Sequence, residues 1–286
     1  MRITVLGSGT STGVPEYLCD CATCQDARGP GSKNYRTRPS IHVQKESGNL
    51  LFDATPNFVD QIDRRGITRI DAVVYTHSHN DHIAGTNDLV LPCRKQKMDM
   101  PIYAQPETLA ILQRNFDYMF TKETFQGGGV GHLIPNAIDG PFELLGFALT
   151  PIPVEHSVLP VVGFRIDDFG YVPDMKRMPD KSRELLRGVE ALVIDGLSFN
   201  ASHPTHHSVR QAIEIINDLA PREAWFTHIS HRLDHRHFRQ QCEENNLTLP
   251  ENVYLAHDGQ VIDLATKLSP GSDSDAPTRS QEGSKD

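Results

Sequence analysis

Short apolar runs typical of buried strands alternate along this chain with segments of helical periodicity. The runs that predict strands are 2–6, 40–43, 49–52, 72–75, 102–104, 147–154, 162–166, 170–172, 191–194, 223–227, 253–256 and 260–263. Helical patterns cover 57–65, 106–116, 180–187 and 208–219, the last with Ser208 in a capping position. Each half begins with strands and continues with strand–helix units, which predicts an α/β fold: a four-layered αββα sandwich of two sheets between helices.

Two segments do not fit this alternation. Residues 117–141 are aromatic and glycine-rich, and they suit either a lid over a site or an ordinary surface excursion. Residues 265–286 are poor in apolar side chains, so we expect a disordered C-terminal tail. The expected organisation is one domain over residues 1–264, followed by that tail.

Composition limits the partners that the protein can have. The chain has 286 residues, of which 38% are hydrophobic, enough for a sizeable core. Its formal net charge of −9 disfavours a general electrostatic grip on nucleic acid or on an anionic membrane. The first residues lack the apolar core of a signal peptide and no later run suits a membrane span, so we expect a cytoplasmic protein. In that compartment its clustered cysteines favour metal or redox roles over disulfides.

The most distinctive stretch is Thr76-His77-Ser78-His79-Asn80-Asp81-His82, which directly follows the apolar run 72–75. In an extended segment side chains alternate between faces, so His77 and His79 point the same way. Asp81 and His82 follow where the chain turns toward a helix. Three imidazoles and a carboxylate at this spacing predict a metal site, whereas a polar loop of solvated histidines is the simpler alternative.

Three further strand ends supply potential ligands: His156, Asp174 and His228. Each is weak evidence alone, because a histidine or aspartate at a strand end is more often a hydrogen-bonded residue or a helix cap. Together with the motif at 76–82 they make seven ligands. That number suits two ions bridged by one carboxylate and one solvent oxygen.

A second cluster comprises Cys19, Cys21 and Cys24. Three thiolates are one ligand short of a closed tetrahedral zinc site, and three free thiols in a loop remain the alternative. Cys93 and Cys242 have no partners nearby in the sequence, and we expect ordinary buried thiols there.

The motif at 76–82, followed by His156, Asp174 and His228, resembles the metallo-β-lactamase fold superfamily of hydrolases. The opening Gly-Ser-Gly-Thr-Ser-Thr-Gly-Val-Pro, the cluster Cys19–Cys24 and the segment Thr227-His228-Ile229-Ser230-His231 are similar to its PhnP-like branch, the phosphoribosyl 1,2-cyclic phosphate phosphodiesterases. The resemblance covers about residues 1–264. It departs from the branch at Met175-Lys176 and at His257, positions that bear on the shape of the substrate pocket and not on the metals.

The resemblance implies a role for each site residue. One ion is assigned to His77, His79 and His156, the other to Asp81, His82 and His228, with Asp174 bridging and Asp53 bracing the ligand loop. A structural zinc is assigned to Cys19, Cys21, Cys24 and His231. The resemblance also places His206 at the mouth of the site, to bind the phosphoryl group or assist the leaving group. His207 and His203 are the alternatives, and we expect His207 to face solvent.

The function expected is that of a dinuclear metal-dependent hydrolase, a phosphodiesterase acting on a small, cyclic phosphodiester. Two divalent ions, manganese or zinc, would lower the pKa of a shared water and provide a bridging hydroxide as the nucleophile, with Asp81, Asp174 and His206 as catalytic residues. The expected partner is a small-molecule substrate, and a homodimer is left open.

Three alternatives stay open. Processing of RNA in the manner of ribonuclease Z needs a basic arm to bind the RNA. Residues 117–146 contain Lys122 and no other lysine or arginine, and the basic run Arg94-Lys95-Gln96-Lys97 is a weak substitute. A thioester or lactone hydrolase would use the same metal ligands. A metal-bound accessory or carrier protein on the same fold is the alternative without catalysis.

Overall fold

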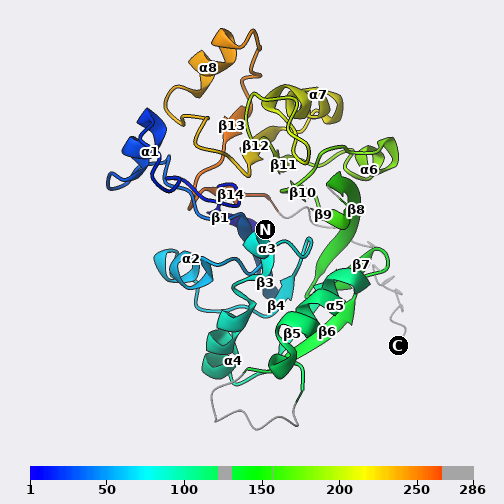
Figure 1. Cartoon of the computed structure of the whole chain (residues 1–286). Coiled ribbons are helices and arrows are strands. Elements are labelled where there is room, and N and C mark those ends of the chain that lie inside the picture. Colours follow the sequence, from blue (N-terminus) through cyan, green and yellow to red (C-terminus); the bar gives the residue numbers. More distant parts are fainter. Residues whose placement is uncertain (122–130, 157, 266–286) are drawn as a thin grey trace, which may run out of the picture.

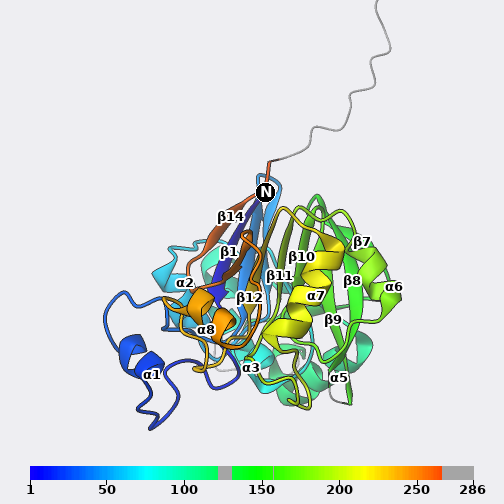
Figure 2. The ribbon, with the colours of Figure 1, turned by 90° about the horizontal axis from the view of Figure 1, so that it is seen from above.

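Two seven-stranded β-sheets form the centre of the computed structural model, which describes residues 1–121, 131–156 and 158–265. The first sheet has the order β14-β1-β2-β3-β4-β5-β6 and the second the order β13-β12-β11-β10-β9-β8-β7. Figure 1 shows the chain coloured along its sequence, and Figure 2 shows the two sheets side by side, with α6 and α7 outside the second.

The bounds of the elements are as follows. The strands of the first sheet are β1 (Arg2–Gly7), β2 (Ser40–Lys45), β3 (Gly48–Phe52), β4 (Ala72–Val74), β5 (Met100–Ala104), β6 (Leu133–Ala137) and β14 (Val261–Asp263). Those of the second are β7 (Phe142–Leu144), β8 (Phe147–His156), β9 (Leu159–Ile166), β10 (Phe169–Val172), β11 (Ala191–Asp195), β12 (Glu223–Thr227) and β13 (Val253–Leu255). The helices are α1 (Ala22–Ala27), α2 (Phe58–Arg64), α3 (Asn80–Ile83), α4 (Val90–Gln96), α5 (Pro106–Asn115), α6 (Asp180–Leu185), α7 (Val209–Leu219) and α8 (Phe238–Glu244), with 3₁₀ turns η1 (Thr86–Leu89) and η2 (Asp117–Met119).

Successive side chains of the buried strands point alternately to the layer between the sheets and to the helices outside them. On β4, Ala72 and Val74 pack between the sheets, whereas Val73 faces the helices of the first sheet. On β11, Val193 lies between the sheets while Ile194 packs in the cluster that holds the apolar face of α7. Because successive side chains of a strand point to opposite faces, fully apolar strands need cover on both sides. The four-layered αββα sandwich expected from the sequence is therefore the observed fold.

The parallel parts of the two sheets set the position of the site. Strands β3 to β6 are parallel to one another, as are β10 to β13. The carboxyl ends of parallel strands meet at one edge of a sheet, which is where α/β folds bind ligands. Asp195 is the last residue of β11, and Asp53, His77, Asp174 and His228 closely follow the ends of β3, β4, β10 and β12.

Every strand and helix predicted from the sequence is present, with bounds that differ by a few residues. The prediction missed the edge strands β6 and β7 and the short helices α1, α4 and α8. These elements bury few side chains, so they show no clear apolar period: β6 buries only Leu133 and α4 only Cys93. Part of the suggested lid, residues 122–130, and residues 266–286 of the expected tail lie outside the described residues. Across the described ranges, the helices are too short or too polar to traverse a bilayer.

Candidate metal centre

A buried carboxylate fixes the position of the loop after β4. Thr76 donates its backbone N–H to Asp53 Oδ1 at 2.8 Å and its hydroxyl to Asp53 Oδ2 at 2.9 Å. The chain then stays extended through His79, the N-cap of α3, and turns into the helix at Asn80. As a result His77 and His79 come from the extended segment and His82 from the helix, as the sequence predicted.

The first group of ligands consists of His77, His79, His156 and Asp174, whose ligand atoms all lie within 4.8 Å of one another. His79 Nδ1 lies 3.0 Å from His77 Nε2 and 3.3 Å from His156 Nε2. Asp174 Oδ2 lies 3.8 Å from His77 Nε2 and 3.6 Å from His156 Nε2. Three imidazole nitrogens and one carboxylate oxygen thus converge on a single point.

The second group consists of Asp81, His82 and His228, again within 4.8 Å of one another. Asp81 Oδ2 is 3.5 Å from the Nε2 atoms of both His82 and His228. Asp174 reaches this group as well, with Oδ1 at 3.1 Å from His82 Nε2 and Oδ2 at 3.4 Å from His228 Nε2. Asp174 therefore lies between the two groups, in the position of a bridging ligand.

Among the residues that the structure describes, several atoms of these groups are buried without a hydrogen-bond partner. They include Nε2 of His82, Nε2 of His228 and Oδ1 of Asp174. Buried polar atoms almost always have partners, because an unsatisfied one costs desolvation free energy. Lone pairs that face one another across a few ångströms fit metal ions, and two ions match the two groups.

The protonation states favour cation binding. Burial lowers the pKa values of His77, His79 and His156, so these imidazoles are neutral and free to coordinate. Burial opposes ionisation of Asp174, but the neighbouring histidines, led by His228 and His82, hold its pKa well below the usual range. Despite burial, the carboxylates around His82 raise the pKa of that imidazole well above its ordinary value. This excess of negative charge is what a bound cation would neutralise.

Partners behind the ligands fix their orientation. Asp53 Oδ2 lies 2.7 Å from His82 Nδ1, and His156 Nδ1 donates to the carbonyl of Thr205 at 2.6 Å. Each contact leaves Nε2 of the ring directed at the metal centre, an arrangement that sets the tautomer and strengthens the ligand. Asp53 thus lies where the sequence placed it, behind the ligand loop.

His206 lies at the metal centre, paired with a carboxylate to which the sequence analysis gave no role. His206 Nδ1 is 2.8 Å from Asp195 Oδ2, and its Nε2 is 4.0 Å from Asp174 Oδ2. Burial opposes the charge on His206, yet Asp195 raises the pKa of the imidazole to about 9. Asp195 also accepts the backbone N–H of Met175 at 3.0 Å, which ties His206 to the loop of the bridging ligand. The position of Asp195 at the end of β11 was the one feature of the sequence that could have indicated this role.

The neighbouring histidines differ from His206. The expectation that His207 faces solvent is wrong: its side chain is buried, because the capping box of Ser208 and Gln211 holds this segment against the protein at the start of α7. His203 lies further out, half-buried, with its ring centroid 5.2 Å from that of His206. Among the three, His206 alone combines a carboxylate partner with a position against Asp174.

The four residues assigned to a structural zinc also meet. Cys19, Cys21, Cys24 and His231 offer ligand atoms within 4.8 Å of one another, and His231 Nδ1 lies 3.2 Å from the sulfur of Cys19. Although burial opposes its ionisation, hydrogen bonds from Cys24 and His231 lower the pKa of Cys21 to about 7, while burial raises that of Cys24 to about 12. Three thiols and one imidazole suit tetrahedral zinc, which would neutralise the thiolates.

This cluster fastens the amino-terminal loop beside the metal centre. Ile229 donates its backbone N–H to the carbonyl of Ser8 at 2.9 Å, and Thr10 donates to the carbonyl of Ile229 at 3.1 Å. Ile229 directly follows the ligand His228. A metal ion at the cysteine cluster would therefore hold both sides of this contact together.

Comparisons with known proteins agree with this geometry. A family model described as "Beta-lactamase superfamily domain" matches residues 48–229. A crystal structure described as a new diphosphatase from the PhnP family superposes with a TM-score of 0.81 and 35% identity, over 92% of this chain and 98% of the other. Zn²⁺-bound PqqB from Methylobacterium extorquens shares the fold, with a TM-score of 0.71 and 24% identity over 92% of this chain and all of that one.

Two curated relatives have different names. An octanoyltransferase of Porphyromonas gingivalis is 33% identical over 260 residues, which are 91% of this chain and 51% of that protein. The chain thus spans about half the length of this relative. A coenzyme PQQ synthesis protein B of Methylobacterium radiotolerans is 30% identical over 229 residues, 68% of this chain and 73% of the other.

Proposed function

We propose that this chain, which belongs to the metallo-β-lactamase fold superfamily of metal-dependent hydrolases, is a phosphodiesterase with two catalytic metal ions. The substrate we propose is a small, cyclic phosphodiester. The observation that carries the proposal is the position of Asp174 between two groups of buried ligands. The proposed structural zinc at Cys19, Cys21, Cys24 and His231 completes the set of metals.

The metals and the protein have separate tasks. Bound to the two groups, divalent zinc or manganese ions would lower the pKa of a water molecule and neutralise negative charge on a phosphoryl group. Asp174 and Asp81 supply the negative charge that keeps two cations close together. Asp53 and the carbonyl of Thr205 hold His82 and His156 with their Nε2 atoms inward.

His206 is the residue that we assign to proton transfer. In the absence of metal ions its pKa of about 9 means that it carries a proton at neutral pH, and its Nε2 lies 4.0 Å from Asp174 Oδ2, facing the metal centre. A protonated imidazole there can donate a hydrogen bond to a phosphoryl oxygen, or a proton to the departing alkoxide. Asp195 keeps the ring charged and oriented, as the carboxylate does in other His–Asp pairs.

Hydrolysis of a diphosphate is the second candidate, because the PhnP-family structure at 35% identity is described as a diphosphatase. Both reactions displace an oxygen from an anionic phosphorus centre, so the same ligands and the same His206 would serve either. The octanoyltransferase name does not favour an acyl substrate, since half of that relative lies outside the match. The net charge of −9 disfavours RNA.

A substrate panel separates the candidates. The metal-loaded protein is assayed with bis(4-nitrophenyl) phosphate, a five-membered cyclic ribose phosphodiester, ADP-ribose as a diphosphate, and a thioester. We expect the cyclic phosphodiester to have the highest kcat/KM. ADP-ribose as the better substrate would transfer the assignment to the diphosphatase, and turnover of the thioester alone would contradict both.

A matched pair of variants links any activity to the centre. Asp174→Ala removes the bridging ligand, whereas Asp139→Ala removes an exposed carboxylate elsewhere in the chain. Turnover should vanish in the first and persist in the second. Turnover that survives Asp174→Ala would exclude the two-metal mechanism. Two bound ions without hydrolysis of any ester would favour an accessory or carrier protein.

A further inference from the structure

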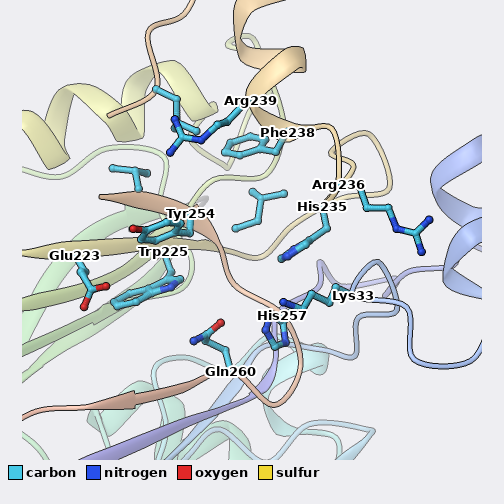
Figure 3. A pocket seen from close by; sticks show the side chains of 13 residues that line it. Lys33, Glu223, Trp225, His235, Arg236, Phe238, Arg239, Tyr254, His257 and Gln260 are labelled. Carbon is cyan, nitrogen blue, oxygen red and sulfur yellow. The ribbon is translucent and has the colours of Figure 1, made fainter. Parts of the chain in front are cut away.

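A cavity of about 460 Å³ opens at the edge of the sandwich where β13 and β14 are the outermost strands of their sheets. Figure 3 shows its walls: Trp225 and Tyr254 on one side, Lys33, His235 and His257 on the other, with Phe238 and Arg239 above and Gln260 below. The ligands of the proposed metal sites do not line this cavity. It is therefore separate from the catalytic centre.

The aromatic wall arises from the sheet register. Trp225 on β12 pairs with Tyr254 on β13 in a parallel ladder, which places both side chains on the same face. Their ring centroids are 6.1 Å apart, with the planes inclined by 34°. Trp225 is buried in the layer between the sheets, while Tyr254 remains 41% exposed at the edge of the sheet. At the edge of the sheet, the exposed ring of Tyr254 is therefore accessible to a ligand.

The opposite wall is cationic, in a protein with an overall charge of −9. Within the part of the chain that the structure describes, Lys33 and Arg239 form no ion pair with a carboxylate, whereas Arg236 pairs with Asp26 at 3.0 Å. The acidic residue of the lining, Glu223, lies 3.8 Å from Arg222. Lys33 on this wall and Arg239 above the cavity therefore carry charge that no carboxylate of the described residues pairs.

Two histidines on this wall are held in place and uncharged. Two contacts fix His235. Its backbone N–H donates to Asn34 Oδ1 at 2.8 Å, and its Nδ1 lies 3.4 Å from Arg36 Nη2. His257 Nδ1 donates to the carbonyl of Asp258 at 3.2 Å. Burial and the charge of Arg36 lower the pKa of His235 to about 4, so its ring offers hydrogen bonds without adding charge. A wall fixed in advance lowers the entropic cost of binding.

We propose that this cavity binds a planar aromatic ring that carries an anionic group, a ligand of the size and chemistry of a nucleoside monophosphate. The ring would stack on the exposed Tyr254, next to Trp225, since aromatic side chains stack on any nucleobase. The anion would lie between Lys33 and Arg239, and Gln260 and the two histidines would hydrogen-bond the intervening polar atoms. A volume of about 460 Å³ is within the range of small-molecule sites.

Tryptophan fluorescence can report binding in this cavity, because Trp225 is the single tryptophan of the chain. Titration of the metal-loaded protein with AMP should change the Trp225 emission saturably, and calorimetry should give the same Kd. Adenosine and inorganic phosphate, each lacking one half of the ligand, should bind at least tenfold more weakly. No change in emission and no heat at millimolar AMP would overturn the proposal.

Substitutions in the cavity lining test whether AMP binds there. Lys33→Met combined with Arg239→Gln should weaken AMP binding at least tenfold, and Tyr254→Ala should do so independently through the stacking face. The matched control, Lys95→Met with Arg94→Gln, removes the same charges from exposed positions of α4 and should leave the Kd unchanged. Unchanged affinity in both cavity variants would overturn the proposal.

AMP could also bind at the metal centre, so one variant separates the two sites. Asp174→Ala should abolish hydrolysis yet leave AMP binding intact. Binding that disappears with Asp174→Ala, but survives the double substitution at Lys33 and Arg239, would assign AMP to the metal centre and contradict a second site.

Discussion

Replacement of Asp195 by asparagine tests the role of the buried pair that the structure places at the metal centre. The substitution keeps the shape of the side chain and an oxygen for the 2.8 Å contact with His206 Nδ1, but it removes the negative charge. Burial lowers the pKa of His206, but Asp195, with smaller contributions from Asp174 and Asp81, raises it from 6.5 to about 9. The rise corresponds to about 3 kcal/mol, since one pKa unit is about 1.4 kcal/mol.

Two measurements follow from this magnitude. In the metal-free protein, NMR titration of labelled histidine should show the pKa of His206 falling by about 2 units in Asp195→Asn. In the metal-loaded protein, kcat for the phosphodiester should fall about 100-fold, the lower range for loss of a general acid, with the metal content unchanged. Asp139→Asn should change neither quantity. A His206 pKa that stays near 9, or an unaltered kcat, would refute the assigned role of Asp195.

Three further predictions concern the metals and the fold. Asp53→Asn should weaken metal binding about 10- to 100-fold by releasing His82 Nδ1, as competition with a chelator would show; equal affinity would contradict the bracing role. Cys21→Ser should reduce the metal content by one ion per chain in elemental analysis, and an unchanged content would mean that the cysteines bind none. Burial lowers the pKa of His42 to about 4, so unfolding takes up a proton between that value and 6.5, and stability is lost as the pH falls through this window. From pH 7 to 5, the unfolding free energy should therefore fall by about 2 kcal/mol more in the wild type than in His42→Leu, and equal losses would show that His42 is not the group responsible.

The sequence predicted the sandwich and the seven side chains that gather at the candidate metal centre, because both depend on local patterns. Apolar runs such as 72–75 identify buried strands, and the spacing from His77 to His82 identifies ligands on a strand end and a helix. The carboxyl ends of parallel strands then bring Asp174 and His228 to the same edge.

The sequence could not predict contacts that depend on how loops return to the sheet. Asp195 differs from other strand-end aspartates only because the 198–208 loop folds back and places His206 beside it. His207 follows His206 directly and looked equally polar, yet the cap of α7 turns it inward. The cavity between Trp225 and Lys33 joins residues almost two hundred positions apart, and no local pattern encodes it.

The central claim is that two ions bound around Asp174 hydrolyse a phosphodiester. Its most direct test is a titration of the metal-free protein with Mn²⁺ while release of nitrophenol from bis(4-nitrophenyl) phosphate is followed. We predict that turnover rises as the His/Asp groups fill with two ions per chain, and that it stays absent in Asp174→Ala at every metal concentration. Two ions bound at these groups without hydrolysis of any phosphodiester would contradict the account.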